Sequence, residues 1–154
     1  MKQKVLAMLM TVALCVTSIW FVDFETKAED MGEDISFSEL MTEDALVGVM
    51  ESQTWGVYLL DGYSIINKIS STKIGAGGTT TAARKCKVST TAIVEKWSGG
   101  VWGRVTSWTN TVTSGYSSSV SKSLTVTTGY NYRVRCLHYA GTDGSSSFTS
   151  NLYM

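Results

Sequence analysis

The sequence contains a single histidine, His138, which is followed closely by Asp143, and serines are abundant around both. Hydrolytic catalysis needs either a pair of carboxylates or a nucleophile beside a base. A triad of His138, Asp143 and one of the serines can be drawn, because the first two are close in the chain. Closeness does not orient side chains, however, and serine is too common here to be a signal. We therefore predict that the protein is not an enzyme.

Metal and cofactor chemistry also lacks a pattern in this sequence. Cys86 and Cys136 are far apart and are accompanied by one histidine, which is not the spacing of a zinc site. The Asp-Gly pairs at 61–62 and 143–144 are turn signals rather than a calcium-binding loop. The stretch "GAGGTTT" at 75–81 lacks the Lys-Ser/Thr pair and the helix of a phosphate-binding loop, so it predicts a turn. We expect no metal and no cofactor.

Aromatic and basic residues meet in the segment "KWSGGVWGRVTSW" at 96–108, whose paired glycines predict a hairpin. Trp102, Arg104 and Trp108 share one strand parity. Val101 and Val105 have the other parity and are the better core candidates. Aromatic faces suit sugar rings, and basic groups suit anionic polymers. The alternative is that the tryptophans cover the sandwich edge or the acidic segment. The candidate ligand-binding residues are Lys96, Trp102, Arg104 and Trp108.

The elements that would position these residues are short β-strands. Residues 129–136, "GYNYRVRC", alternate apolar and polar side chains with the period of a half-buried strand. From Tyr63 onward Ser and Thr are interleaved with Val, Ile and aromatic residues, which is strand composition with a polar outer face. This pattern predicts an all-β antiparallel sandwich of about seven strands. The predicted strands are 64–74, 79–90, 91–98, 101–108, 118–127, 130–139 and 146–153, with turns at 75–78, 98–100, 113–115, 128–129 and 140–144.

The first 28 residues predict a secretory signal peptide. A basic start is followed by an uncharged apolar run at 5–22, and small residues precede the boundary after Ala28. We expect cleavage at this boundary and a secreted protein. Because the apolar run approaches membrane-spanning length, an uncleaved membrane anchor at 5–22 is the alternative. Cys15 is interpreted as an apolar residue of the signal, since Leu14 stands where lipid modification requires a small residue.

The net charge of zero conceals a division of charge along the chain. Eight acidic residues and no basic residue lie between 29 and 52, whereas ten Lys and Arg residues and three acidic residues follow. We expect residues 29–62 to form an acidic lead that is weakly helical or disordered, and residues 63–154 to form one β-sandwich domain. The lead is either a solvated spacer or a segment that screens the basic domain.

Two cysteines follow the predicted signal, and export would leave Cys86 and Cys136 free to pair. A disulfide would close a loop of about 50 residues and stabilise the fold by about 3–4 kcal/mol if it were unstrained. Two buried free thiols are the alternative. The two possibilities stay equally open, because the sequence does not give the distance between the Cα atoms.

Residues 124–150, "LTVTTGYNYRVRCLHYAGTDGSSSFTS", resemble the E–F–G region of a fibronectin type III domain. Tyr130 matches the tyrosine-corner position of that family, and Val134 and Cys136 match the inward residues of its F strand. The resemblance implies an immunoglobulin-like sandwich in which Gly129 makes the corner. It also implies that the Tyr130 ring packs under this corner and that its hydroxyl bonds back to the backbone.

A second resemblance covers most of the chain after the signal. The segments "VTSW" (105–108), "SVSKSLTVT" (119–127) and "GYNYRVR" (129–135) are similar to those of small secreted proteins from Gram-positive, mainly clostridial, bacteria. These proteins are classed as a domain of unknown function. The resemblance implies no activity and assigns no catalytic residue.

The function predicted from these observations is a secreted, non-enzymatic binding module for a glycan or an anionic cell-wall polymer. An extracellular domain that pairs with another surface protein through a sheet edge is the alternative, and a hydrolase is the remote one. Nucleic-acid binding is not expected, because the basic residues are spread over many strands of an exported protein. Membrane contact is expected only through an uncleaved segment at 5–22.

Overall fold

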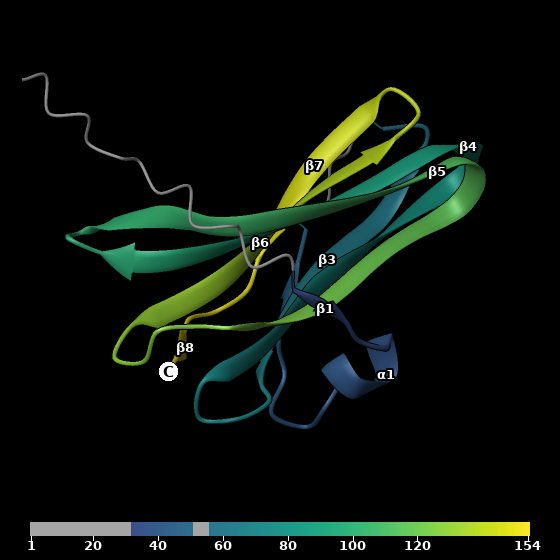
Figure 1. The fold of residues 1–154 in the computed structure, drawn as a ribbon. Coiled ribbons are helices and arrows are strands. Elements are labelled where there is room, and N and C mark those ends of the chain that lie inside the picture. Colours follow the sequence, from purple (N-terminus) through teal and green to yellow (C-terminus); the bar gives the residue numbers. More distant parts are fainter. Residues whose placement is uncertain (1–31, 51–55) are drawn as a thin grey trace, which may run out of the picture.

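The computed structural model describes residues 32–50 and 56–154, which form eight strands and one short helix. The elements in chain order are β1 (Glu33–Asp34), α1 (Phe37–Leu40), β2 (Leu46–Val49), β3 (Leu59–Lys68), β4 (Lys73–Ser98), β5 (Val101–Thr125), β6 (Asn131–Ala140), β7 (Asp143–Phe148) and β8 (Leu152–Tyr153). All of these strands pair antiparallel. The predicted all-β antiparallel class is confirmed, and the strands form a sandwich-like arrangement (Figure 1).

One long hairpin, made of β4 and β5, contributes to both layers of this arrangement. β4 has 26 residues and β5 has 25. The first half of β4 pairs with β3 and the second half with β6, while β5 accompanies β4 along both halves. The first layer therefore has the order β1-β5-β4-β3-β2, and the second has the order β5-β4-β6-β7, with β8 also beside β6. Both long strands turn back at the upper right of Figure 1, where their pairing is irregular around Cys86.

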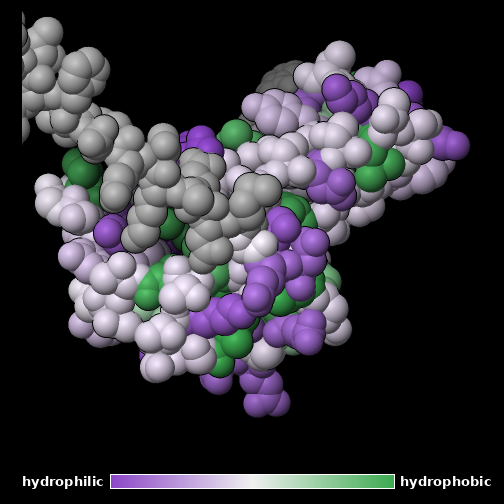
Figure 2. All heavy atoms as spheres, viewed as in Figure 1, coloured by the Kyte–Doolittle hydropathy of each residue, from purple (hydrophilic) through white to green (hydrophobic). Residues whose placement is uncertain are grey.

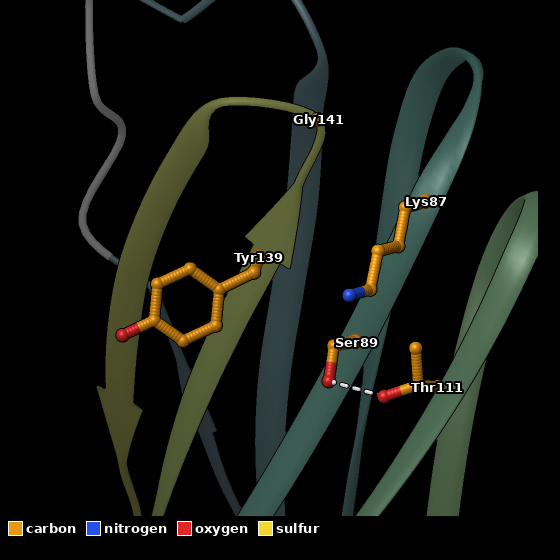
Figure 3. A pocket seen from close by; sticks show the side chains of 5 residues that line it. All are labelled: Lys87, Ser89, Thr111, Tyr139 and Gly141. Carbon is orange, nitrogen blue, oxygen red and sulfur yellow. Dashed lines mark hydrogen bonds between the residues drawn. The ribbon is translucent and has the colours of Figure 1, made fainter.

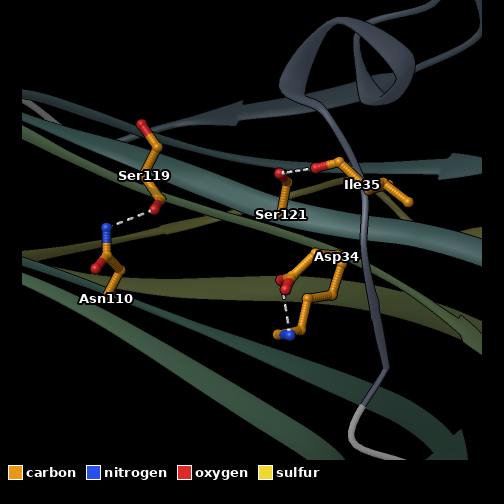
Figure 4. Close-up of polar contacts among 6 residues, drawn as sticks. Asp34, Ile35, Asn110, Ser119 and Ser121 are labelled. Carbon is orange, nitrogen blue, oxygen red and sulfur yellow. Dashed lines mark hydrogen bonds and ion pairs between the residues drawn. The ribbon is translucent and has the colours of Figure 1, made fainter.

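Hydrogen bonds between residues of the same strand show how sharply the hairpin folds back. On β4 the Thr90 hydroxyl donates to Thr80 Oγ1 at 2.7 Å. On β5 the Asn110 side-chain amide donates to the carbonyl oxygen of Ser119 at 2.9 Å (Figure 4). Such residues would be about 30 Å apart in a straight strand. The two halves of the hairpin therefore lie face to face, and polar side chains join the layers near the bend.

The main hydrophobic core lies between the two layers. β6 contributes Tyr132, Val134 and Cys136, which alternate with less buried residues as the sequence pattern predicts. The other buried members come from β3, β4, β5, the segment after β5 and the C-terminal residue: Ile66, Ile74, Ala76, Ala92, Val94, Trp108, Leu124, Val126 and Met154. Burial of this apolar surface is the main favourable term for a sheet whose outward residues are largely Ser and Thr. On the face seen in Figure 2, hydrophobic residues appear only as separate patches among more polar ones.

Two predicted turns are wrong, because residues 75–78 lie inside β4 and residues 113–115 lie inside β5. The glycines of the first segment serve close packing instead. A Cβ on Gly77 would overlap the carbonyl oxygen of Val120, and a Cβ on Gly78 would overlap the sulfur of Cys136. The turn predicted at 98–100 is confirmed, since Gly99 and Gly100 join β4 to β5 with positive φ angles of 61° and 84°.

The described part of the acidic lead belongs to the folded domain, so the predicted boundary at residue 63 is wrong. β1 pairs with β5, β2 pairs with β3, and Leu40 of α1 is completely buried. Glu33 forms an ion pair with Lys73 at 2.6 Å, and Asp34 forms one with Lys122 at 2.8 Å. Figure 4 shows the ion pair of Asp34 beside the segment that joins β1 to α1. Glu33 and Asp34 therefore neutralise lysines of the first layer.

The tyrosine whose hydroxyl bonds back to the backbone beside the Gly129 corner is Tyr132 rather than the predicted Tyr130. The Tyr132 ring is 1% exposed, and its hydroxyl donates to the carbonyl oxygen of Thr127 at 2.7 Å. Gly129 makes the corner, as predicted, with a φ of 86°. Tyr130 lies two residues nearer to the turn, where its ring is partly buried and the Lys96 ammonium lies 4.5 Å from the ring centroid.

Cys86 and Cys136 are free thiols, so the structure contains no disulfide between them. Cys136 belongs to the main core, whereas Cys86 packs against a separate cluster of Ala82, Val88 and Ala140 near the bend. Burial raises the pKa of the Cys136 thiol far above its usual range. The structure therefore has two free thiols rather than a bridge, but only Cys136 is buried, and Cys86 is partly exposed.

The signal peptide predicted at 1–28, its cleavage after Ala28 and the alternative anchor at 5–22 lie outside the described residues. Within residues 32–50 and 56–154, no helix is long and apolar enough to cross a membrane.

Candidate functional site

The outward side chains of the second layer form a continuous surface across β5, β4, β6 and β7, which we call the outer face. Its residues alternate with the buried residues of the core, so its position is fixed by the strand period of two. Register brings the residues of neighbouring strands into rows: Arg104, Glu95 and Arg133; Thr109, Thr91 and Leu137; and Thr111, Ser89 and Tyr139. Hydroxyl groups dominate the middle of this surface, and aromatic residues lie towards both ends.

At the hairpin end of the outer face, Trp97 and Trp102 form an open aromatic pair. They are directly paired across β4 and β5, and their ring centroids are 5.3 Å apart with an angle of 58° between the planes. Trp97 is 40% exposed. The two rings line a shallow pocket of about 160 Å³ together with Asn131 and Asn151. The pocket thus combines two aromatic rings with two side-chain amides, each of which can donate and accept hydrogen bonds.

A charged cluster that contains Arg133 packs against one of these tryptophans, Trp102. The Arg133 guanidinium carbon lies 4.3 Å from the Trp102 ring centroid and 5.1 Å from that of Phe148. Arg133 Nε donates to Glu95 Oε2 at 2.7 Å, and Arg135 Nε lies 3.1 Å from Glu95 Oε1. The Glu95 carboxylate is almost fully buried, so it needs the two cations as partners. One carboxylate shared by two guanidinium groups leaves a net positive charge next to the aromatic pair.

The four predicted ligand-binding residues do not all meet at this place. Trp102 and Arg104 lie on the outer face, as predicted. Trp108 is only 9% exposed and belongs to the main core, so its assignment to the ligand site is wrong. Lys96 points to the opposite side of β4 from Trp97, because adjacent strand residues face opposite ways, and its ammonium lies over Tyr130.

A β-bulge explains the error at Trp108. Val94 pairs with Thr106, but the next residue, Glu95, pairs with Arg104, which leaves Val105 as an extra residue on β5. An extra residue reverses which face the following side chains occupy. The bulge therefore places Trp102 outside and Trp108 inside although they share a sequence parity. Val105 is 38% exposed and Val101, at the hairpin tip, is 65% exposed, so their assignment to the core is also wrong.

A second shallow pocket of about 270 Å³ lies at the other end of the outer face, near the bend. Lys87, Ser89 and Thr111 line it from β4 and β5, and Tyr139 and Gly141 line it from β6 and the following turn (Figure 3). This pocket could not be predicted from the sequence, because its residues come from three distant segments. The Tyr139 parity was visible in the sequence, but the position of β6 beside β4 was not.

The only histidine takes no part in either pocket. His138 is completely buried between the layers, where Nδ1 lies 2.8 Å from the Thr80 hydroxyl and Nε2 lies 2.8 Å from the Ser147 hydroxyl. Burial lowers the pKa of His138 to about 4, although Asp61 acts in the opposite direction.

The triad drawn from the sequence is not brought together. The Asp143 carboxylate accepts hydrogen bonds from the backbone amides of Tyr58 at 2.6 Å and Leu59 at 3.1 Å. These bonds lower the pKa of Asp143 and direct the carboxylate towards the chain before β3. His138 and Ser147 are in hydrogen-bonding contact, but both are buried from solvent. Their contact joins β6 to β7 within the second layer, whereas the contact of His138 with Thr80 joins the two layers.

Together, the fold and the outer face define a small antiparallel β-domain with an open surface of aromatic, hydroxyl and basic groups. The chain belongs to a family of unknown function, DUF6147, whose sequence profile matches residues 28–152. This match confirms the predicted membership in a domain family of unknown function, and it includes the acidic segment with the β-strands. No match was found to a curated protein or to a solved structure.

Proposed function

We propose that this protein is an extracellular, non-enzymatic binding module for a glycan or an anionic cell-wall polymer. The observation that carries the proposal is the open pair of Trp97 and Trp102 beside Asn131 and Asn151. Sugar rings present apolar C–H faces that stack on aromatic rings, and their hydroxyl groups exchange hydrogen bonds with side-chain amides. The pocket supplies both kinds of group in one place.

The position of the pair favours binding over a structural role. Burying a large aromatic side chain stabilises a fold, and Trp108 of the same hairpin is used in this way. Trp97, by contrast, stays 40% exposed on a hairpin whose tip also exposes Val101. Arg133 is held against Trp102 by its ion pair with Glu95, so the Trp102 ring is positioned before any ligand arrives. Such pre-organisation reduces the entropy cost of binding.

The charge around the pair favours ligands that carry negative groups. Glu95 is the acidic residue of this cluster, and it is shared by Arg133 and Arg135. Arg104 lies in the same row and forms no ion pair with the described residues. An anionic polymer is thus favoured over a neutral one, and its binding would weaken as salt screens the charges. The predicted signal peptide supports an extracellular ligand.

The proposal is tested with a glycan array, followed by calorimetric titration of the best ligand. Trp97→Ala and Trp102→Ala are each expected to weaken binding at least tenfold, which corresponds to about 1.4 kcal/mol. Tyr116→Ala is the matched control, because Tyr116 is also an exposed aromatic residue of β5 but does not line the pocket. Circular dichroism establishes that each variant is folded. The proposal is wrong if no glycan or anionic polymer binds at low salt, or if all three variants bind alike.

A second candidate function is pairing with another protein through β2, which ends the strand order of the first layer. Val47 and Val49 of β2 are 46% and 71% exposed, and an exposed edge of this kind can accept a further strand. A Val49→Lys substitution would then abolish binding of a protein partner and leave glycan binding intact. If the protein binds a glycan and a pull-down with surface proteins captures no partner, this candidate is wrong.

A further inference from the structure

We propose that the pocket formed by Lys87, Ser89, Thr111, Tyr139 and Gly141 is a second binding site, which takes an anionic group of the same extended polymer. This inference rests on the proposed function of the Trp97–Trp102 pair, and it adds a second site and a ligand class. The polymer would lie along the outer face, with one part on the tryptophans and another part in this pocket.

The second pocket has the groups that bind a charged sugar. Tyr139 is 50% exposed and stands on one side of the pocket. On the other side the hydroxyls of Ser89 and Thr111 lie 2.9 Å apart, and the Lys87 ammonium extends into the space between them and the ring (Figure 3). An aromatic face, two hydroxyls and an ammonium can together bind a sugar ring that carries a carboxylate or a phosphate.

Lys87 is available for such a group. Lys73 and Lys122 of the first layer are paired with acidic residues, but Lys87 forms no ion pair within residues 32–50 and 56–154. The acid closest to the pocket in strand register is Asp143, which pairs with Ala140 on the inward side of β6. Its carboxylate is occupied by the backbone amides of Tyr58 and Leu59. Among the residues that the structure describes, no carboxylate neutralises the positive charge of this pocket.

The two pockets lie on one surface and are joined by hydroxyl groups. Ser89 in the second pocket and Trp97 in the first occupy the same face of β4, eight residues apart, which corresponds to about 26 Å. Between them the Thr91 and Thr109 hydroxyls form a cross-strand hydrogen bond of 2.8 Å. Thr91 and Thr109 therefore offer hydrogen-bonding groups between the two pockets, as an extended polymer requires.

The experiment compares three polymers on the chain that remains after the predicted cleavage: polygalacturonate, which carries carboxylates, poly(glycerol phosphate), which carries phosphodiesters, and neutral dextran. At least one anionic polymer should bind more tightly than dextran, and its affinity should rise with chain length until the polymer spans both pockets. The carboxylate and phosphate arms identify the source of the negative charge. Binding to dextran alone, or affinity independent of polymer length, would overturn the proposal.

Variants separate this inference from the proposed function. Lys87→Gln and Tyr139→Ala should each weaken binding of the long anionic polymer about tenfold, and Lys87→Gln should also reduce the dependence of affinity on salt. Lys85→Gln is the matched control, because Lys85 is an exposed lysine at the same bend but does not line the pocket. An equal loss in Lys85→Gln and Lys87→Gln would show unspecific charge attraction and overturn the second site.

The failure of the second site can be told from the failure of the proposed function. If Trp102→Ala abolishes polymer binding while Lys87→Gln and Tyr139→Ala bind like the unmodified protein, the second site is wrong and the binding function stands. If the Trp102, Lys87 and Tyr139 variants all bind like the unmodified protein, both proposals are wrong. A short oligosaccharide that contacts only the tryptophans should bind Lys87→Gln without loss, and a loss there would also count against the second site.

Discussion

The buried histidine makes the stability of this fold depend on pH. His138 lies between the layers with both ring nitrogens 2.8 Å from hydroxyls, those of Thr80 and Ser147. A Cβ on Gly62 would come within 2.6 Å of the ring, so the space around the imidazole is filled. Both hydroxyls can accept as well as donate, so hydrogen bonding alone permits the imidazolium. The loss of hydration in the interior is what disfavours the charged form.

The size of the effect follows from the difference between two pKa values. The ordinary pKa of histidine, 6.5, applies to the unfolded chain, and burial lowers the folded value to about 4. Between these values the unfolded chain binds a proton that the folded chain does not bind, so stability falls as the pH falls. The neutral form contributes fully above pH 6.5, and about 3 kcal/mol is lost when the pH has fallen to about 4. Below that pH this residue causes no further loss.

Two carboxyl groups also make the stability depend on pH, but they act in a lower pH range than His138. The pKa of Asp143 is lowered from 3.8 by backbone hydrogen bonds, and that of Glu39 is lowered from 4.5 by hydrogen bonds with Ser36. A carboxyl group with a lowered folded pKa contributes stability above its ordinary pKa and loses it as the pH falls towards the folded value. Both groups therefore act mainly below pH 5, whereas His138 acts between pH 4 and pH 6.5.

The assay is urea unfolding followed by tryptophan fluorescence at several pH values from 5 to 8. The free energy of unfolding should fall by about 2 kcal/mol between pH 6.5 and pH 5. His138→Gln is the control, because glutamine keeps a donor and an acceptor but does not titrate, and its stability should be nearly constant over this range. Equal slopes in both proteins would refute the reasoning. If the variant does not fold, the chemical shift of the single histidine in the unmodified protein decides, and a midpoint near 6.5 would be the refuting result.

Two further predictions concern packing. Tyr132→Phe should lower the free energy of unfolding by about 1–2 kcal/mol, because it removes the buried hydroxyl that donates to the Thr127 carbonyl oxygen. Tyr130→Phe should change this free energy by less than about 0.5 kcal/mol. Equal costs of the two substitutions in urea unfolding would contradict the assignment of the corner to Tyr132. Gly78→Ala should cost about 1–3 kcal/mol, because the new methyl group would meet the Cys136 sulfur. Gly103→Ala should melt at nearly the same temperature as the unmodified protein, because its Cβ would make only an ordinary contact of 3.9 Å with the Lys96 carbonyl oxygen. Similar melting of the two glycine variants would show that the layers can separate at no cost.

The strand period was the most reliable information in the sequence. It predicted the buried side of β6 correctly from Tyr132 to Cys136, because burial on one face of a strand selects apolar residues at alternate positions. It did not predict strand length. Glycine can mark a turn or a close approach of two layers, and the sequence of 75–78 looks the same in both cases. Only the position of Val120 and Cys136 against these glycines decides between them.

The strand period also predicted part of the candidate site. Trp102 and Arg104 were assigned correctly to the outward side, since they lie on the tip side of the bulge. Trp108 lies beyond Val105, and no local sequence signal marks the extra residue. The second pocket requires the pairing of β4 with β6, which joins residues about 50 positions apart. Pairings at such separations depend on the whole fold and are not encoded in a short pattern.

The bulge and the fold-back together explain how one hairpin supplies both the core and the candidate site. Without the extra residue at Val105, Trp102 and Trp108 would occupy the same face, and the hairpin would have either two exposed rings or two buried ones. With it, Trp108 anchors the hairpin in the core while Trp102 stays beside Trp97 and Arg133. Deleting Val105 should therefore affect both properties at once. We expect the variant to lose stability and ligand binding together, whereas Trp102→Ala loses binding alone, and a stable Val105 deletion with normal binding would show that the bulge does not set the orientation of these rings.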